Sequence, residues 1–148
     1  MQYNTLTPRT VQRAAANLPQ TTQTAYFTVV GRVRVLSLVG EVTTEMHADA
    51  NNVDLWANPT VGADVALCAV LDIASDAVGT IYTITGTFAT AMVATTSGAV
   101  APASQIPEPG ILVAAGTIDL KTDASKTGAT KWTIQYVPED AGSYIVAA

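Results

Sequence analysis

Cysteine, histidine and positive charge are scarce in this sequence of 148 residues. The single cysteine, Cys68, excludes a disulfide within the chain. It lies in the apolar run DVALCAVLD, so we expect a buried and unreactive thiol. The single histidine, His47, would have to serve any catalytic centre that requires an imidazole. Apolar runs are also short: none reaches the roughly 18 residues of a membrane-spanning helix, so the sequence predicts no membrane span.

The basic residues are too few and too scattered for a nucleic-acid-binding surface. Lys and Arg number 7 against 12 Asp and Glu, which gives a formal net charge of −5. No basic cluster alternates with aromatic residues, so we expect no nucleic-acid partner. The first residues, MQYNTLTPRTVQRAAANLP, contain no apolar core of the kind that a signal peptide has. We therefore expect the chain to be made and kept in the cytoplasm, or to be released only by lysis.

Residues that favour β-strands are abundant. Val, Thr and Ile together number 47, whereas Lys and Glu together number 7. This balance predicts an all-β domain. Charged residues make up only 13% of the chain, and 25 of its apolar residues are Ala, so we expect a thin core and a weakly charged surface. Such a surface keeps molecules apart poorly, which favours a protein that packs against copies of itself or a partner over a soluble monomer.

The segment KWTIQYVPEDAGSYIVAA shows the clearest strand pattern. Trp132, Ile134 and Tyr136 alternate with polar residues, which is the period of a strand with one buried face. Residues 138–142 then read as a turn, and residues 143–147 as a further short strand. The segment therefore predicts two strands separated by a turn.

Other apolar segments give a total of about eight expected strands, bounded by turn residues. We expect strands in residues 25–44, 53–56, 65–73, 80–95 and 111–120, the last of them paired with 131–138. The pattern predicts an antiparallel β-sandwich or barrel, jelly-roll-like in organisation. The stretch TSGAVAPASQIPEPG holds three prolines and reads as a loop.

Residues 1–24 stand apart from these strands. TPRTVQRAAANLP permits a short helix near residues 8–17, with Thr7 as its N-cap and Pro8 at its first position. Its apolar face is weak, so an extended arm is equally compatible. We therefore expect an N-terminal arm or short helix in residues 1–24 and a β-sandwich domain in residues 25–148.

Residues with catalytic or metal-binding chemistry form no complete constellation. Glu45, His47 and Asp49 alternate, and on a strand they would share one face that could bind a divalent metal. Nothing nearby completes such a site, so we expect no metal. A Ser-His-Asp triad lacks a nucleophile-elbow motif for its serine. The sequence therefore predicts no enzyme and no cofactor.

Four carboxylates, those of Asp119, Asp123, Glu139 and Asp140, lie near the expected last hairpin. A pair of them could hydrolyse glycosides only if one were buried. Asp123 and Asp140 lie in turn-like contexts, where Asp accepts hydrogen bonds from backbone amides. We expect this structural role.

Aromatic residues could also form a platform on which sugars stack. The tryptophans are Trp56 and Trp132, and five tyrosines accompany them. The alternating stripe around Trp132 is more typical of a core than of a binding site. We therefore expect the core role.

Three segments together resemble small structural proteins encoded in the head gene clusters of tailed bacteriophages. They are NLPQTTQTAYFTVVGRVRVLSLVGEVTT, GTIYTITGTFATAMVAT, and ILVAAGTIDLKT followed by TGATKWTIQYVPEDAGSYIVAA. The resemblance implies a virion component, a capsid decoration (cement) protein that is often trimeric and sits on the lattice of the major capsid protein. It carries over no active-site residue.

The expected function is therefore to stabilise a capsid from its surface, with the major capsid protein and further copies of this chain as partners. We expect residues 1–24 and the loop 95–110 to make the assembly contacts. The candidate contact residues are Arg9, Val11, Arg13, Leu18, Pro102 and Pro107. The alternative is a receptor- or carbohydrate-binding module of a head or tail fibre, which exposed aromatics around Trp56 or Tyr82 would favour.

Overall fold

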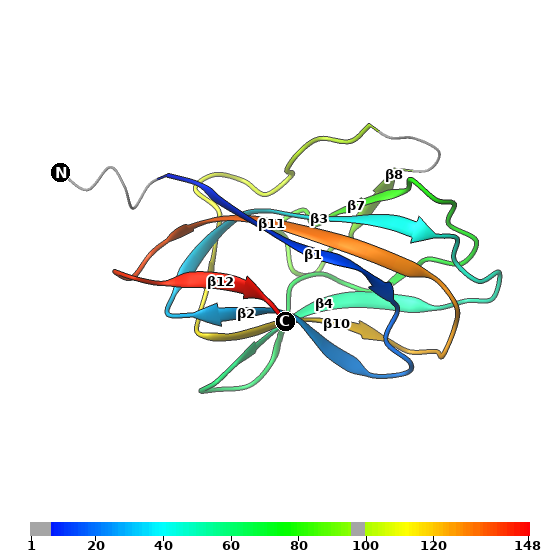
Figure 1. Cartoon of the computed structure of the whole chain (residues 1–148), viewed down its shortest axis with the longest axis horizontal. Coiled ribbons are helices and arrows are strands. Elements are labelled where there is room, and N and C mark those ends of the chain that lie inside the picture. Colours follow the sequence, from blue (N-terminus) through cyan, green and yellow to red (C-terminus); the bar gives the residue numbers. More distant parts are fainter. Residues whose placement is uncertain (1–6, 96–99) are drawn as a thin grey trace.

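The computed structural model describes residues 7–95 and 100–148. These residues form two antiparallel β-sheets that pack face to face, and they contain no helix (Figure 1). The predicted all-β class and the antiparallel sandwich are confirmed. Of the two architectures that the sequence left open, the chain adopts the sandwich and not a closed barrel.

The first sheet has the strand order β1-β11-β3-β7-β8, and β9 also pairs with β3. Because β11 pairs along nearly the whole of β3, β7 and β9 occupy successive parts of the other edge of β3. The strands of this sheet are β1 (Arg9–Asn17), β3 (Val33–Thr44), β7 (Ile81–Thr83), β8 (Val93–Thr95), β9 (Ile111–Val113) and β11 (Ala129–Pro138).

The second sheet has the order β12-β2-β10-β4-β5, and β6 also pairs with β4. Its strands are β2 (Gln23–Val30), β4 (Asn52–Pro59), β5 (Val65–Ala66), β6 (Leu71–Asp72), β10 (Gly116–Thr122) and β12 (Tyr144–Ala147). β5 and β6 are two residues long, so the expected core strand 65–73 is wrong as a continuous strand, although Leu67, Cys68 and Ile73 are buried as expected.

The end of the chain follows its sequence pattern. Trp132, Ile134 and Tyr136 of β11 are buried between the sheets, and the residues between them are half-exposed. The short strand expected in residues 143–147 is β12. The expected pairing of residues 111–120 with 131–138 is wrong, because β10 lies in the second sheet between β2 and β4, whereas β11 lies in the first sheet between β1 and β3.

The long strand expected in residues 25–44 is two strands in different sheets. The chain leaves β2, turns at Gly31 and enters β3. Gly31 has a φ of 73°, and a Cβ there would lie 2.7 Å from Cβ of Ser143. A residue with a side chain would be strained in this left-handed conformation, so the glycine permits the chain to cross between sheets.

The N-terminal segment is a strand, not the short helix that the sequence permitted. β1 pairs antiparallel with β11 from Arg9 to Asn17, and Figure 1 shows it (dark blue) alongside β11 (orange). Leu18 follows it into the core and is buried. As a strand, β1 hydrogen-bonds its backbone to β11 and so becomes part of the sheet. A short helix with so weak an apolar face would have had little packing to stabilise it. The expected boundary at residue 24 consequently falls inside β2.

A row of paired residues crosses the first sheet and fixes the core. Trp132 is paired with Gly40, and Gly40 is paired with Tyr82. The Trp132 ring stacks on that of Tyr82, with centroids 6.4 Å apart, and meets the edge of Tyr26 from the second sheet at 6.5 Å. A Cβ on Gly40 would lie 2.6 Å from Trp132, so the indole occupies the space that a side chain would need.

This close approach predicts a specific cost for Gly40→Ala. Overpacking of this kind costs about 1–3 kcal/mol, so we expect the free energy of unfolding in urea to fall by about that amount. Trp132→Phe removes part of the obstructing ring, and Gly40→Ala made in that background should therefore cost less. Equal costs in both backgrounds would show that the indole does not fill this space. Thr133→Ala on the half-exposed face serves as the control, with an expected change within about 0.5 kcal/mol.

Candidate assembly surfaces

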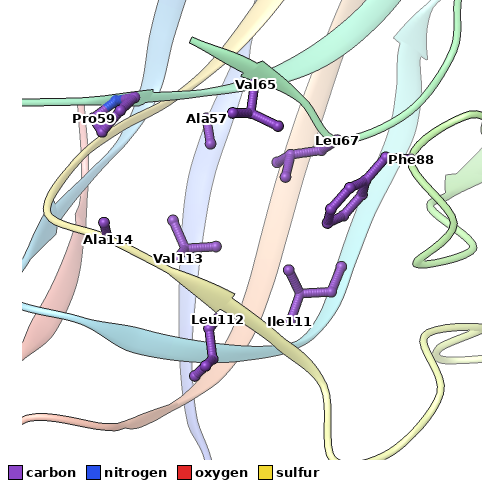
Figure 2. Close-up of a pocket in the computed structure, with 9 residues that line it drawn as sticks. All are labelled: Ala57, Pro59, Val65, Leu67, Phe88, Ile111, Leu112, Val113 and Ala114. Carbon is purple, nitrogen blue, oxygen red and sulfur yellow. The ribbon is translucent and has the colours of Figure 1, made fainter. Parts of the chain in front are cut away.

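An apolar groove opens between the two sheets, beside β5 and β9. Figure 2 shows Val65, Leu67 and Phe88 on one side of it and residues 111–113 on the other. Its volume is about 220 Å³. No charged side chain lines it. The lining residues are Ala57, Pro59, Val65, Leu67, Phe88, Ile111, Leu112, Val113 and Ala114.

The groove leaves large apolar side chains partly exposed. Leu112 is 56% exposed, Val65 50% and Phe88 46%. Their neighbours Ile111, Val113 and Leu67 are buried, so the core is continuous with this exposed surface. Contiguous apolar surface on a folded protein is typical of an interaction site.

Local strand pairing creates this exposure. Within the described residues, β9 pairs only with β3, and β5 pairs only with β4. Both strands are short and lie at sheet edges, so the side chain of Leu112 has a sheet neighbour on one side only. Sequence reasoning expected a strand in residues 111–120 but missed the groove. Whether Leu112 or its neighbours Ile111 and Val113 become exposed depends on the sheet edge that β9 joins. The local sequence pattern does not specify that edge.

Three of the expected contact residues share one row of β1. Arg9, Val11 and Arg13 alternate along the strand and pair with residues 136, 134 and 132 of β11. We name them the arginine row. Arg9 is exposed, Val11 packs against the edge of the core, and Arg13 is half-buried.

Arg13 is held against an aromatic ring. Its Cζ lies 3.8 Å from the centroid of the Tyr26 ring, a cation–π contact. Its Nε and Nη1 atoms are buried and have no acceptor among the described residues. Because these atoms are buried, Arg13 packs β1 against the second sheet and does not offer these two donors to a partner.

The remaining expected contact residues lie elsewhere. Leu18 is buried in the core, so it supports β1 rather than offering a free surface. Pro102 and Pro107 are exposed on the loop before β9. Residues 96–99 of that loop lie outside the described residues. The structure therefore places Arg9, Val11 and Arg13 on one strand and the two prolines on the loop before β9.

The second half of this loop is attached to the first sheet. The Ser104 hydroxyl donates to the Leu36 carbonyl oxygen at 2.6 Å, and Gln105 Nε2 donates to Thr83 Oγ1 at 3.0 Å. Ile106 is buried and belongs to the core. Any contact that this loop makes with a partner would therefore come from a segment that is already bound to the first sheet.

The alternating Glu45, His47 and Asp49 do not form a metal-binding face. All three residues follow the end of β3 and are exposed. Lys126 Nζ lies 2.8 Å from Asp49 Oδ2, and this hydrogen bond is the largest cause that lowers the pKa of the Asp49 carboxyl. Among residues 7–95 and 100–148, no group of three His, Cys, Asp or Glu side chains is placed to hold a metal ion.

Asp123 and Asp140 accept hydrogen bonds from backbone amides, as expected from their turn-like contexts. The Asn52 amide donates to Asp123 Oδ1 at 2.8 Å, and the Asn52 side chain donates to Oδ2 at 2.8 Å. These two bonds lower the pKa of the Asp123 carboxyl, the side-chain bond being the larger cause. The Arg32 amide donates to Asp140 Oδ2 at 3.2 Å.

The other two carboxylates have partners of their own. Buried Asp119 accepts hydrogen bonds from Gln23, Asn58 and Thr117 at 2.8, 3.3 and 2.6 Å. Glu139 forms an ion pair with Arg34 at 2.9 Å.

The aromatic residues lie mostly inside. Trp132, Tyr26, Tyr82 and Tyr136 are buried, which confirms the core role expected of the Trp132 stripe. Trp56 is half-buried, and Lys121 Nζ lies over its ring at 5.1 Å. No flat aromatic face is formed by these residues.

No family model, curated protein or solved structure matches this chain. In the part of the chain that the structure describes, no helix is long and apolar enough to cross a membrane.

The buried Cys68 generates a prediction about its reactivity. Burial raises the pKa of its thiol to about 11. At pH 8 only about a thousandth of such a thiol is ionised, so labelling of the native protein should be far slower than in denaturant. The labelling rate should keep rising from pH 9 to pH 11. Because the folded state binds this proton more tightly than the unfolded state, the free energy of unfolding should fall over the same range. Native labelling at the denatured rate would contradict burial.

Proposed function

We propose that this chain is a viral structural protein: a capsid decoration, or cement, protein of a tailed bacteriophage. It binds the lattice of the major capsid protein at the surface of the virion and stabilises it, as a homotrimer. The proposal gives the chain no catalytic role and no cofactor. The observation that carries it is the apolar groove beside β9, whose side chains gain stability only when a partner covers them.

The groove can supply useful binding energy. A fully buried Leu or Phe side chain contributes about 1.5–3 kcal/mol relative to an exposed one. Leu112 and Phe88 are about half exposed, so covering them contributes roughly 1 kcal/mol each. A symmetric oligomer on a symmetric lattice repeats each contact, and the repeated contacts bind together more tightly than one alone.

The sequence resemblance determines the partner that we propose for the groove. The segments that resemble head-gene-cluster proteins cover most of the sandwich, including β3, β10 and β11. An uncharged, apolar groove fits an apolar segment of the major capsid protein better than a charged surface, because a charged group placed there would lose its water without gaining a partner.

The alternative function is a receptor- or carbohydrate-binding module of a fibre. Exposed aromatics at Tyr82 or Trp56 were the features that would favour it. Tyr82 is buried, and the Trp56 ring has Lys121 over it. Tyr144 is partly exposed but stands alone among the tyrosines described here in that respect. The apolar groove and the buried aromatic residues therefore favour the capsid decoration function over the carbohydrate-binding alternative.

Binding to empty heads of the virus that encodes the chain tests the proposal. We expect Leu112→Ser to weaken binding about fivefold per contact, the equivalent of about 1 kcal/mol, and more where several copies bind together. Val78→Ser is the matched control, because Val78 is 61% exposed in a turn before β7, away from the groove. If the Leu112→Ser variant binds the heads as tightly as the unmodified chain, the groove does not contact the capsid. An intact protein that ignores capsids and is retained by immobilised glycans would establish the alternative.

A further inference from the structure

The bend between β1 and β2 holds a threonine in a strained backbone conformation. Thr21 has a φ of 56°, in the left-handed region, where a β-branched residue is a rare outlier. Glycine adopts this conformation readily, because it has no Cβ. The bend comprises residues 20–22, and all three are exposed to water. Because exposed residues gain little from packing, local burial does not offset the strain at Thr21.

The hydrogen bonds of the bend are ones that water can replace. The Thr21 and Ser125 hydroxyls are 2.7 Å apart, and both residues are exposed. Gln20 Nε2 donates to the carbonyl oxygens of Leu18 and Lys126, at 2.9 and 3.2 Å. Exposed hydrogen bonds contribute little net stability, since water bonds to either partner when the bond breaks. Opening the bend therefore releases the Thr21 strain and loses little else.

The segment before the bend, residues 9–19, binds the rest of the sandwich through contacts that any copy can supply. Within the described chain β1 pairs only with β11, and Figure 1 shows it at the edge of the first sheet. The buried Leu18 donates its amide hydrogen to the Gly128 carbonyl oxygen at 3.0 Å. The Pro19 carbonyl oxygen accepts from Thr122 Oγ1 at 2.8 Å. A second copy carries the same β11 and the same buried positions, so it offers the same contacts.

We propose that β1 is exchanged between copies: residues 9–19 of one chain pair with β11 of the next, and residues 20–22 cross between the two. The exchanged strand keeps its contacts, so the closed and exchanged forms differ mainly at the bend. Relief of the strain at Thr21 favours exchange, as short strained hinges do in general. Passed on in one direction, the exchange closes into a ring of copies. The inference deepens the proposed function, on which it rests for the number of copies, three.

The short bend fixes where two copies meet. Three extended residues span at most about 10 Å, so the second copy must lie directly beside the bend. The turn that joins β10 to β11 contains Ser125 and Lys126, which already contact the bend. The interface between copies is therefore centred on this turn and on residues 20–22.

Disulfide cross-linking shows which chain supplies β1. Gln12 is paired with Thr133 on the solvent-facing side of the first sheet, and facing residues of paired strands are close enough for a disulfide. The variant with both Gln12→Cys and Thr133→Cys is refolded in reductant at low and at high protein concentration, then oxidised. On a denaturing gel without reductant, we expect single chains at low concentration and covalently linked chains at high concentration. Gln12→Cys alone is the control and should give no such product.

Substitutions at Thr21 should shift the oligomer in opposite directions. Thr21→Gly removes the strain from the closed bend, so the concentration for half-association, measured by light scattering, should rise about tenfold or more. Thr21→Pro cannot adopt a positive φ, so it should associate at lower concentration than the unmodified chain. Ser75→Gly is the matched control: Ser75 has a φ of 61° in an exposed turn after β6, and relief of strain there should leave association unchanged.

Three outcomes overturn the strand exchange. They are disulfides confined to single chains at every concentration, an oligomer whose disulfides all lie within chains, and a Thr21→Gly variant that associates like the unmodified chain. If circular dichroism shows that Thr21→Pro does not fold, the cross-links and Thr21→Gly still decide the question. An exchanged oligomer that does not bind empty heads would overturn the proposed function and leave the exchange standing. An unexchanged trimer that binds heads would do the reverse.

Discussion

The packing of Trp132 over Gly40 is the contact on which the rest of the structure depends. A glycine on β3 leaves a gap in the inner face of the first sheet, and the indole fills it while touching Tyr82 on one side and Tyr26 of the second sheet on the other. The indole nitrogen donates to Thr130 Oγ1 at 3.0 Å, so its polar group is also satisfied in the core. In a chain rich in alanine, Trp132 is the largest of the fully buried side chains that fill the core.

The row of paired residues that contains Trp132 and Gly40 continues to Arg13 on β1, at the edge of the first sheet. Arg13 pairs with Trp132 across the strands and lies on the Tyr26 ring, so the core positions the arginine row. At another edge, the short β9 carries the core outward into the apolar groove. The core therefore extends to the edge of the sandwich at both places.

Local sequence patterns predicted the features that local chemistry determines. The excess of β-branched residues gave the fold class, and alternation gave the buried face of β11. Non-local pairing determined what the patterns could not give. Residues 9–17 have little apolar character, and only the free edge of β11 makes them a strand. The change of sheet at Gly31 and the exposure of Leu112 likewise depend on which strand becomes the neighbour. The arginines were expected to make contacts, but their common row required the register of β1.

Amide hydrogen exchange, followed residue by residue, tests the central claim that β1 is an integral strand and holds the arginine row in a fixed position. Exchange reports the free energy of the opening that exposes each hydrogen-bonded amide. The account predicts that the amides of β1 bonded to β11 exchange with protection close to that of β11 and β3. Nearly unprotected exchange in β1, beside strong protection in β11 and β3, would show that residues 9–17 are a detachable arm and would contradict it.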